Sequence, residues 1–376
     1  MHVLLILALC LCWTTLSVAD DQLLIDAKIN DQAVRLIFDT GTEHTTLFGQ
    51  TARRLNLKVT EPPPNPKLKP WQVALGVSEE CRLTIGQSTI RARFGILNLP
   101  EYTRFKVDGV LAWADLRNNI FRILADTKEL SVLKKLPENI CQWSRWNIEQ
   151  DSRFLEVKLP GTSEIDGTIF IDTGTPHGVK LSAKRWKHWR AKLSERQYTL
   201  LASYTPGIGL RVYEERRADK LVLGQVSIMK VPVMPSPSVR ELQFTNYEAT
   251  LGLFALTRLD VIIDGKNSSI YIRPIQKPTS RYQHNRIGAV FVPRDIKSNH
   301  LVAHVAEKSP AQKAGIRNGD ILLKIGGLDV TKWRTDPKVL PLRRFWIRPA
   351  GTKIELSLIR DDKPLKATVE LKDIFP

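Results

Sequence analysis

Two copies of an Asp-Thr-Gly-Thr sequence hold the residues of this chain best suited to chemistry. The first copy is Asp39-Thr40-Gly41-Thr42 and the second is Asp172-Thr173-Gly174-Thr175. Each follows a short apolar run and places an acidic side chain just before a glycine, which permits a sharp turn. One ionised carboxylate at the end of a buried strand would be unfavourable. Two that face each other can share a proton, so we expect the two copies to meet.

A close pair of carboxyl groups can supply an acid and a base to one reaction. Both members cannot ionise comfortably, so the proton affinity of one rises and that of the other falls. We expect the ionised member of the Asp39 and Asp172 pair to activate a water molecule. The protonated member then donates a hydrogen bond to the carbonyl of a peptide bond. Water attacks that carbonyl directly, without a covalent enzyme intermediate.

The residues expected to support the pair lie in the same two turns: Thr40, Gly41, Thr42, Thr173, Gly174 and Thr175. The hydroxyls of Thr40 and Thr173 are suited to cross the seam between the copies and bond backbone on the far side. The outer threonine of each turn is suited to hold a carboxylate oxygen. Histidines follow at His44 and His177, and we expect no catalytic role for them because surface and hydrogen-bonding histidines are far more common.

The order of elements around the first motif repeats around the second, which indicates duplication of one β-rich lobe. The sequence Leu-Thr-Ile-Gly-Gln at residues 83–87 corresponds to Leu-Val-Leu-Gly-Gln at residues 221–225. Strands are expected at residues 23–29, 34–38, 83–85, 90–94, 120–124 and 130–133, and again at 154–159, 168–171, 261–264 and 270–272. Helices are expected at residues 51–57 and 181–193, the second capped by Ser182.

Length and composition describe a globular protein of two or three domains. The chain has 376 residues, of which 43% are hydrophobic and 25% charged. Its formal net charge of +17 is compatible with nucleic acid, an anionic membrane or an acidic envelope polymer as a partner. The lysines and arginines are scattered without a dense basic block. We therefore interpret the charge as a surface bias and expect no nucleic-acid partner.

The first residues predict export. Residues 1–19 are nearly all apolar and end in Ser-Val-Ala, which is typical of a signal peptide cleaved after Ala19. The run is short for a membrane span, and we expect no transmembrane segment after cleavage. A secreted or periplasmic location follows. Cys81 and Cys141 then remain, either as one disulfide or as two free thiols. The cysteines and histidines lack zinc-ligand spacing, so we expect no metal and no cofactor.

The C-terminal part has a pattern of its own. A linker is expected at residues 275–285 and a small β-rich domain at residues 286–376, after a first lobe at residues 20–145 and a second at 146–274. Within the small domain Ser309 is a helix cap, Pro310 takes the first helical position and Gly315 ends the helix. Strands are expected at residues 289–292, 301–305, 321–325, 354–359 and 367–371.

Residues 20–274 resemble the aspartic proteases of the pepsin and retropepsin type. The resemblance rests on the two Asp-Thr-Gly-Thr motifs, each with a later apolar-apolar-small sequence at residues 110–112 and 250–252. It implies a mainly β fold of two lobes with pseudo-twofold symmetry, an acid-favouring endopeptidase activity, and Asp39 and Asp172 as the catalytic dyad. Ala112 stands where the family usually has glycine. No flap tyrosine has a matching context, although Trp71 and Tyr213 lie in plausible flap regions. The alternative is a non-catalytic, protease-like peptide-binding protein of the cell envelope.

Residues 286–376 are similar to PDZ domains of the bacterial type. The similarity rests on the sequence from Ser309 to Leu322 and on Ile325-Gly326-Gly327. It implies that a glycine-containing loop binds a peptide carboxylate and that the next strand pairs with the peptide. The matching residues are Ile287, Gly288, Ala289, Val290 and Phe291. The expected partners are a polypeptide substrate and C-terminal peptides. Such a domain would recruit substrate or gate the cleft, or it would only pack on the protease lobe.

Overall fold

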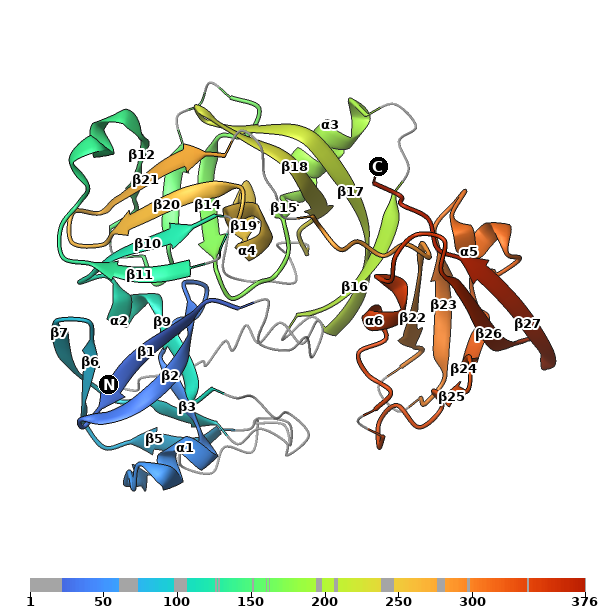
Figure 1. Ribbon diagram of the computed structural model, residues 1–376, viewed down its shortest axis with the longest axis horizontal. Coiled ribbons are helices and arrows are strands. Elements are labelled where there is room, and N and C mark those ends of the chain that lie inside the picture. Colours follow the sequence, from blue (N-terminus) through green and yellow to red (C-terminus); the bar gives the residue numbers. More distant parts are fainter. Residues whose placement is uncertain are drawn as a thin grey trace.

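The computed structural model describes residues 22–60, 74–97, 107–125, 127, 129–150, 152–159, 161, 163–193, 198–205, 209–237, 247–275, 281–295, 298–336 and 338–375. The expected signal peptide and Trp71 lie outside these residues. The described chain forms lobe 1, lobe 2 and a C-terminal domain. In Figure 1, lobe 1 (blue to teal) lies below lobe 2 (green to gold), and the C-terminal domain (orange to red) lies beside lobe 2.

Lobe 1 is built on a nine-stranded sheet with the order β4-β5-β8-β3-β9-β2-β1-β6-β7 in the described residues. Its elements are β1 (Leu24–Ile29), β2 (Gln32–Asp39), β3 (Thr46–Phe48), α1 (Gly49–Arg54), β4 (Val59–Thr60), β5 (Ala74–Ser78), β6 (Cys81–Ile85), β7 (Ser88–Ala92), β8 (Gly95–Leu97), β9 (Gly109–Ala112) and α2 (Trp113–Leu116). The β1–β2 turn has positive φ at Asn30 and Asp31, two residue types that tolerate it. The register that follows buries Leu36 and Phe38 of β2.

Lobe 2 is built on a twelve-stranded arrangement with the order β11-β10-β20-β21-β12-β13-β14-β19-β15-β18-β17-β16 among the described residues. Its elements are β10 (Ile120–Leu124), β11 (Glu129–Leu133), η2 (Glu138–Gln142), β12 (Ser144–Ile148), β13 (Glu156–Leu159), β14 (Gly167–Asp172), β15 (Val179–Leu181), α3 (Ala183–Ala191), β16 (Thr199–Thr205), β17 (Gly209–Leu223), β18 (Val226–Pro235), β19 (Ala249–Gly252), α4 (Leu253–Leu256), β20 (Leu259–Asp264) and β21 (Ser269–Pro274). The strands β10 and β11 come from the first half of the sequence and join this sheet through β20.

The two lobes repeat one topology. In lobe 1, β2 runs parallel to β9 with Asp39 opposite Ala112, and in lobe 2, β14 runs parallel to β19 with Asp172 opposite Gly252. The order β4-β5-β8-β3 next to β9 matches the order β16-β17-β18-β15 next to β19. One hydrophobic core runs through both lobes. The expected mainly β fold with two pseudo-twofold lobes is confirmed.

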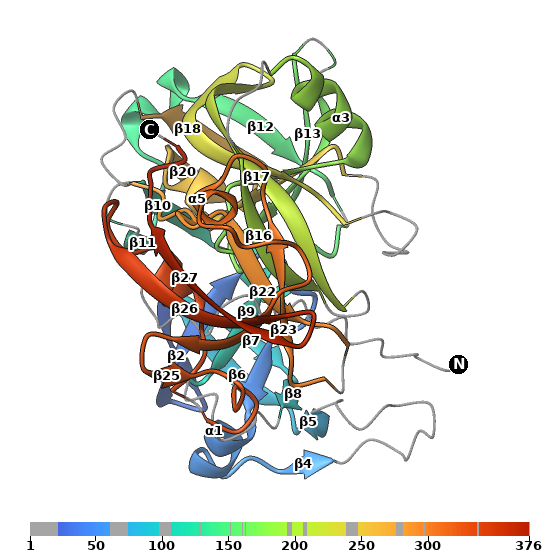
Figure 2. The same cartoon turned by 90° about the vertical axis from the view of Figure 1, so that its right-hand side faces the viewer.

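The C-terminal domain has a separate hydrophobic core and a sheet with the order β22-β23-β24-β26-β27. Its elements are β22 (Ala289–Pro293), β23 (Leu301–Val305), α5 (Pro310–Lys313), β24 (Ile321–Ile325), β25 (Leu328–Asp329), α6 (Arg343–Trp346), β26 (Lys353–Arg360) and β27 (Lys363–Glu370). Ser309 caps α5 as expected, since its Oγ accepts the Gln312 N–H at 3.2 Å. The edge strand β22 lies against β16 of lobe 2 (Figure 1, Figure 2).

Three further expectations can be compared with the structure. The helix expected at residues 181–193 is α3, and the Ser182 side chain caps it by accepting the Arg185 N–H. Cys81 is buried, Cys141 is exposed and both thiols are free, which decides between the two alternatives for this pair. No helix of the described chain is long and apolar enough to cross a bilayer.

Candidate active site

The two Asp-Thr-Gly-Thr turns lie at the ends of two buried parallel strand pairs. Strand β2 ends at Asp39 and strand β14 ends at Asp172. The apolar residues before each aspartate fill the common core and hold the strand ends in place. The aspartates themselves are 7% and 8% exposed. Both carboxyl groups therefore lie in a site largely shielded from water.

The inner threonines join the lobes through reciprocal hydrogen bonds. The Thr40 N–H donates to Thr173 Oγ1 at 3.0 Å, and the Thr173 N–H donates to Thr40 Oγ1 at 3.1 Å. Each hydroxyl then donates across the seam, Thr40 to the Ile171 carbonyl and Thr173 to the Phe38 carbonyl, both at 2.7 Å. Both side chains are fully buried. These bonds fix the relative position of the two turns, as their sequence predicts.

Each carboxyl group rests on the glycine of the opposite turn. A Cβ atom built on Gly41 would lie 2.6 Å from Asp172 Cγ, and one built on Gly174 would lie 2.5 Å from Asp39 Oδ1. Real Cβ atoms are not found this close to other heavy atoms, so only glycine fits at either position. The arrangement brings the two acids, which are far apart in the sequence, to the centre of one site.

Backbone N–H groups orient the carboxylates. The Gly41 N–H donates to Asp39 Oδ1 at 2.8 Å. Asp172 Oδ1 accepts from the Gly174 N–H at 3.1 Å and from the Thr175 N–H at 3.2 Å. Thr175 thus reaches its aspartate through the backbone, while its hydroxyl accepts from Lys180 Nζ at 3.3 Å. In the described residues, Thr42 is buried without a hydrogen bond to Asp39.

The environments of the two aspartates raise both pKa values but differ in detail. Burial raises the pKa of Asp39, repulsion by Asp172 raises it further, and the N–H groups of Gly41 and Gly174 oppose the shift. Burial also raises the pKa of Asp172, and here the Lys180 ammonium opposes the shift together with the nearby N–H groups. A cation beside one acid only favours the proton on the other. The pair is therefore biased toward a neutral Asp39 and an ionised Asp172.

This bias comes from a difference between the lobes. Lys180 lies opposite Thr250 in lobe 2, and Thr46 lies opposite Val110 at the corresponding position of lobe 1. Lobe 1 thus has a neutral side chain where lobe 2 has a cation. The sequence analysis missed Lys180. The one signal available was a lysine in a short strand that is otherwise apolar.

The structure explains why lobe 2 needs glycine as the last residue of β19. A Cβ built on Gly252 would lie 2.8 Å from Thr175 Cγ2 and 2.9 Å from the carbonyl carbon of His177. The Gly252 N–H donates to the Gly178 carbonyl at 2.8 Å. The backbone of His177 is thus one of the groups that exclude a side chain here. The His177 ring is buried, and burial lowers its pKa, with the Lys180 ammonium lowering it further.

Lobe 1 accommodates Ala112 through a different contact. The Ala112 N–H donates to Thr45 Oγ1 at 3.0 Å, and the Thr45 hydroxyl donates to Asp115 at 2.5 Å. A side-chain hydroxyl here replaces the backbone carbonyl used in lobe 2, and Ala112 is fully buried. The departure from the family pattern is therefore compatible with the position of Asp39. Sequence reasoning missed Thr45 because its partner, Asp115, is distant in the chain.

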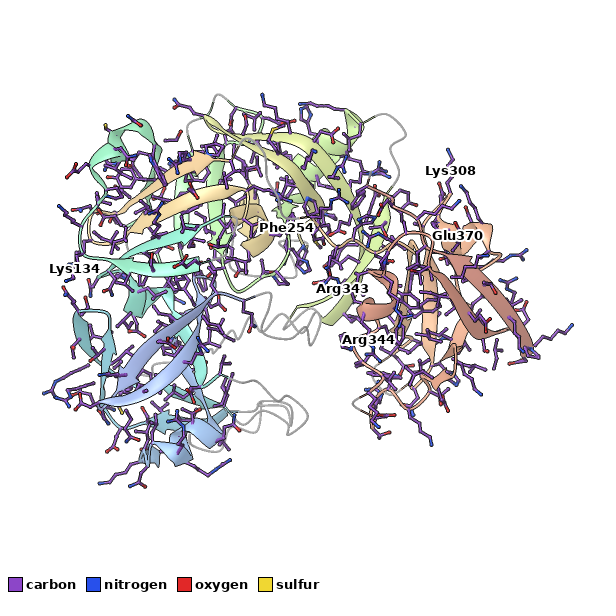
Figure 3. All side chains as sticks on the ribbon, in the orientation of Figure 1. Lys134, Phe254, Lys308, Arg343, Arg344 and Glu370 are labelled. Carbon is purple, nitrogen blue, oxygen red and sulfur yellow. The ribbon has the colours of Figure 1, made fainter. Side chains whose placement is uncertain are left out.

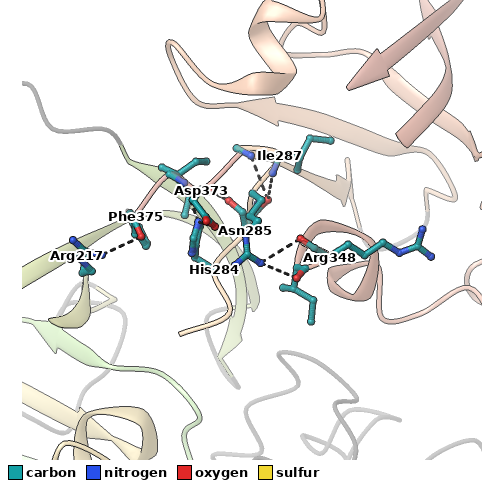
Figure 4. Close-up of polar contacts among 12 residues, drawn as sticks. Arg217, His284, Asn285, Ile287, Arg348, Asp373 and Phe375 are labelled. Carbon is teal, nitrogen blue, oxygen red and sulfur yellow. Dashed lines mark hydrogen bonds and ion pairs between the residues drawn. The ribbon is translucent and has the colours of Figure 1, made fainter. Parts of the chain in front are cut away.

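The loop expected to bind a peptide carboxylate is occupied from within the chain. Its residues Ile287, Ala289, Val290 and Phe291 are buried, and Gly288 has the positive φ of 67° that such a loop requires. The N–H groups of Ile287 and Gly288 donate to Asn285 Oδ1 at 3.2 and 3.3 Å (Figure 4). The structure thus assembles the predicted loop but directs its donors to a side chain of the linker.

Comparison with protein families agrees with this geometry. Residues 25–91 match the family model described as aspartyl protease, and residues 286–371 match the one described as PDZ domain. The chain joins an aspartyl protease domain to a PDZ domain. The first match includes Asp39 and its turn, and the second includes the whole loop from Ile287 to Phe291. The comparison with curated proteins gave no significant match.

The comparison with solved structures found a match to part of this chain. The crystal structure of Basic 7S globulin from soybean aligns at 12% sequence identity over 67% of this chain and 91% of that chain, with a TM-score of 0.40. Within the described residues, no group of three or more His, Cys, Asp or Glu side chains is placed to hold a metal ion.

Proposed function

We propose that this protein is an exported aspartic endopeptidase in which Asp39 and Asp172 form the catalytic dyad. The observation that carries the proposal is the reciprocal seating of the carboxyl groups, each on the glycine of the opposite turn. Two buried acids are unfavourable for folding unless the site uses them. The apolar first 19 residues support export of the chain, and its substrate class is polypeptide.

In the proposed mechanism the two aspartates have different roles. Asp172, beside the Lys180 cation, is the ionised base and takes a proton from a water molecule held between the carboxyl groups. Asp39, kept neutral by burial and by repulsion from Asp172, donates its proton to the substrate carbonyl oxygen. The water oxygen bonds to the carbonyl carbon and forms a neutral diol. Asp172 then gives its proton to the nitrogen while Asp39 takes a proton from a diol hydroxyl. The C–N bond breaks, and both aspartates return to their starting protonation states.

Cleavage of an unfolded protein tests the proposal. Wild type, Asp39→Asn and Asp172→Asn are compared from acidic to neutral pH, with Asp26→Asn as the control because Asp26 is an exposed acid of the same lobe. We expect cleavage by wild type and by the control, strongest at acidic pH, and a loss of several orders of magnitude in both dyad variants. Equal cleavage by all four proteins would exclude the dyad.

We also propose that the PDZ domain regulates the protease lobes. The PDZ domain contacts lobe 2 directly, since the Glu307 N–H donates to the Tyr198 hydroxyl at 3.1 Å. The linker before it adds two contacts: the Tyr282 hydroxyl donates to Glu215 at 2.6 Å, and the ring centroids of Tyr282 and Phe254 lie 4.8 Å apart. Phe254 lies in α4, directly after Gly252. In Figure 3, Phe254 of lobe 2 and Arg343 of the PDZ domain lie on the two sides of this junction. These contacts favour gating by a docked domain, with recruitment of substrate peptides as a second role.

A further inference from the structure

Asn285 lies at the junction of three segments. Its Oδ1 accepts the N–H groups of Ile287 and Gly288, as described above. Its Nδ2 donates to the Leu200 carbonyl of β16 at 2.9 Å and to the Ala289 carbonyl of β22 at 2.8 Å. Its own carbonyl accepts the Thr199 hydroxyl at 2.7 Å. Asn285 is 7% exposed, so every polar group of this side chain is used inside the protein.

The bond to Ala289 lies on the edge of the sheet where another strand would add. Ala289 pairs with Val305 of β23, while the Ala306 N–H donates to the Gly288 carbonyl. In an antiparallel pair this pattern marks Ala289 as the non-hydrogen-bonded position, so its carbonyl points away from β23. Asn285 Nδ2 therefore occupies an acceptor on the free edge of β22. Strand β16 lies against the same edge.

The residues next to Asn285 hold it in place. Arg286 forms an ion pair with Asp373 at 2.5 Å and donates to the Ile347 carbonyl at 2.8 Å. The His284 ring accepts the Ile374 N–H at 3.0 Å. Arg217 of lobe 2 donates to the Phe375 carbonyl at 3.0 Å (Figure 4). These bonds tie the chain on both sides of Asn285 to the PDZ domain, and Arg217 ties the last described residues to lobe 2.

We propose that Asn285 is a built-in occupant of the carboxylate site of the PDZ domain, and that a peptide with a free C-terminal carboxylate replaces it and releases β16 from β22. A neutral amide oxygen in a loop of backbone N–H groups stands in for a carboxylate oxygen. A carboxylate makes stronger hydrogen bonds to the same donors, so it can compete. The partner is thus a protein or peptide C-terminus, and internal positions of a chain cannot replace Asn285. The inference builds on the regulatory role proposed for the PDZ domain but is independent of proteolysis.

Release of β16 would act on the protease lobes through the hairpin that it forms with β17. In the sheet of lobe 2 this hairpin takes the edge position that β4 and β5 take in the sheet of lobe 1. Strand β17 pairs with β18, which pairs with β15, the strand that carries Lys180. The docked PDZ domain therefore contacts β16, and β17 and β18 lie between β16 and the strand that carries Lys180.

Two substitutions at one position separate the two halves of this proposal. Asn285→Ala removes both the acceptor in the loop and the donors to β16 and β22. Asn285→Asp keeps an acceptor for the Ile287 and Gly288 N–H groups, with a negative charge, but loses both donor bonds. We expect Asn285→Ala to bind peptide more tightly than wild type, and Asn285→Asp to bind it more weakly. If the two substitutions acted only by damaging the fold, the peptide affinities of both variants would change in the same direction.

The assay is fluorescence anisotropy of the full chain with labelled short peptides that end in an apolar residue, each as the free acid and as the C-terminal amide. We expect Asn285→Ala to bind the free acids about tenfold more tightly than wild type, because roughly one or two net hydrogen bonds no longer compete. The amides should bind weakly to all forms. Hydrogen exchange of the β16 amides should accelerate in both variants and in wild type with free-acid peptide.

Thr199→Val provides a milder test that leaves the PDZ loop intact. It removes only the hydroxyl bond to the Asn285 carbonyl, and we expect roughly a threefold gain in affinity for the free acids. If Asn285→Ala does not fold, Thr199→Val and Asn285→Asp carry the same test, since their affinities must move in opposite directions. Equal affinities in all variants, or equal binding of free acids and amides, would overturn the proposal. Because no arm measures cleavage, failure here leaves the proposed dyad untouched.

Discussion

Replacing either turn glycine by alanine should strongly reduce the proposed protease activity while leaving the chain folded. A Cβ on Gly41 would lie 2.6 Å from Asp172 Cγ, about 1 Å inside ordinary contact distance. Asp172 is 8% exposed and held by two backbone N–H groups, so its carboxyl group cannot retreat without losing them. A displacement of about 1 Å in a catalytic group costs about 100-fold in rate. The same overlap costs about 1–3 kcal/mol in stability. Gly41 lies outside the left-handed region, so the penalty is steric only.

The assay is kcat/KM for cleavage of an unfolded protein at acidic pH, together with thermal unfolding. Gly174→Ala is the symmetric variant, since its Cβ would lie 2.5 Å from Asp39 Oδ1. Gly161→Ala is the matched control, because its Cβ would meet nothing closer than 3.8 Å. We expect a loss of about 100-fold in both turn variants and none in the control. Turn variants that keep wild-type kcat/KM would show that the carboxyl groups are not seated as described.

Three further predictions follow from the other contacts of the site. Thr173→Val should lower the free energy of unfolding in urea by about 1–3 kcal/mol for each buried backbone group left unpaired. Thr84→Val is the control and should cost little, because the Thr84 hydroxyl bonds only the Thr89 hydroxyl at an exposed site. Equal losses in the two variants would contradict the cross-lobe role of Thr173. Lys180→Met should move the acid limb of the pH profile of kcat/KM to higher pH, because the cation no longer opposes the raised pKa of Asp172, and Lys180→Arg should not; an unmoved limb in Lys180→Met would reject the asymmetry. Burial raises the pKa of Glu215 to about 7, with the Tyr282 hydroxyl and Arg343 opposing. The pKa of Glu215 is thus higher in the folded than in the unfolded protein. The stability that this difference contributes is fully present below the ordinary pKa of glutamate and is lost as the pH rises through about 7. Glu215→Gln should remove that loss, on the order of 3 kcal/mol, from unfolding curves between pH 5 and 8.

Local patterns predicted the parts of the fold that depend on neighbouring residues. The Asp39 and Asp172 turns, the β1–β2 hairpin and the cap at Ser309 each follow from a few adjacent residue types, and the structure contains all of them. The duplication was also readable, because both lobes keep the same order of motifs. These features need only the preference of glycine for turns and of apolar residues for buried strands.

The remaining features depend on contacts between distant segments. Strands β10 and β11 were assigned to lobe 1 by their position in the sequence, but they pair into the sheet of lobe 2 through β20. Thr45 substitutes for a backbone acceptor only because Asp115 and Ala112 come next to it in space. Asn285 was read as part of a linker. Its position between β16 and β22 depends on how two domains dock, which no local pattern encodes.

Titration of the two buried carboxyl groups tests the central claim most directly. Aspartate labelled with ¹³C at the carboxyl carbon allows Asp39 and Asp172 to be followed by NMR, each assigned with the Asn variant of the other. We predict two separate steps in wild type, with one proton still bound to the pair well above the usual pKa of aspartate, and a lower pKa for Asp172 in Asp39→Asn, where no second charge can form. Two independent titrations near pH 4, unchanged in the variants, would contradict the shared proton on which the proposed reaction depends.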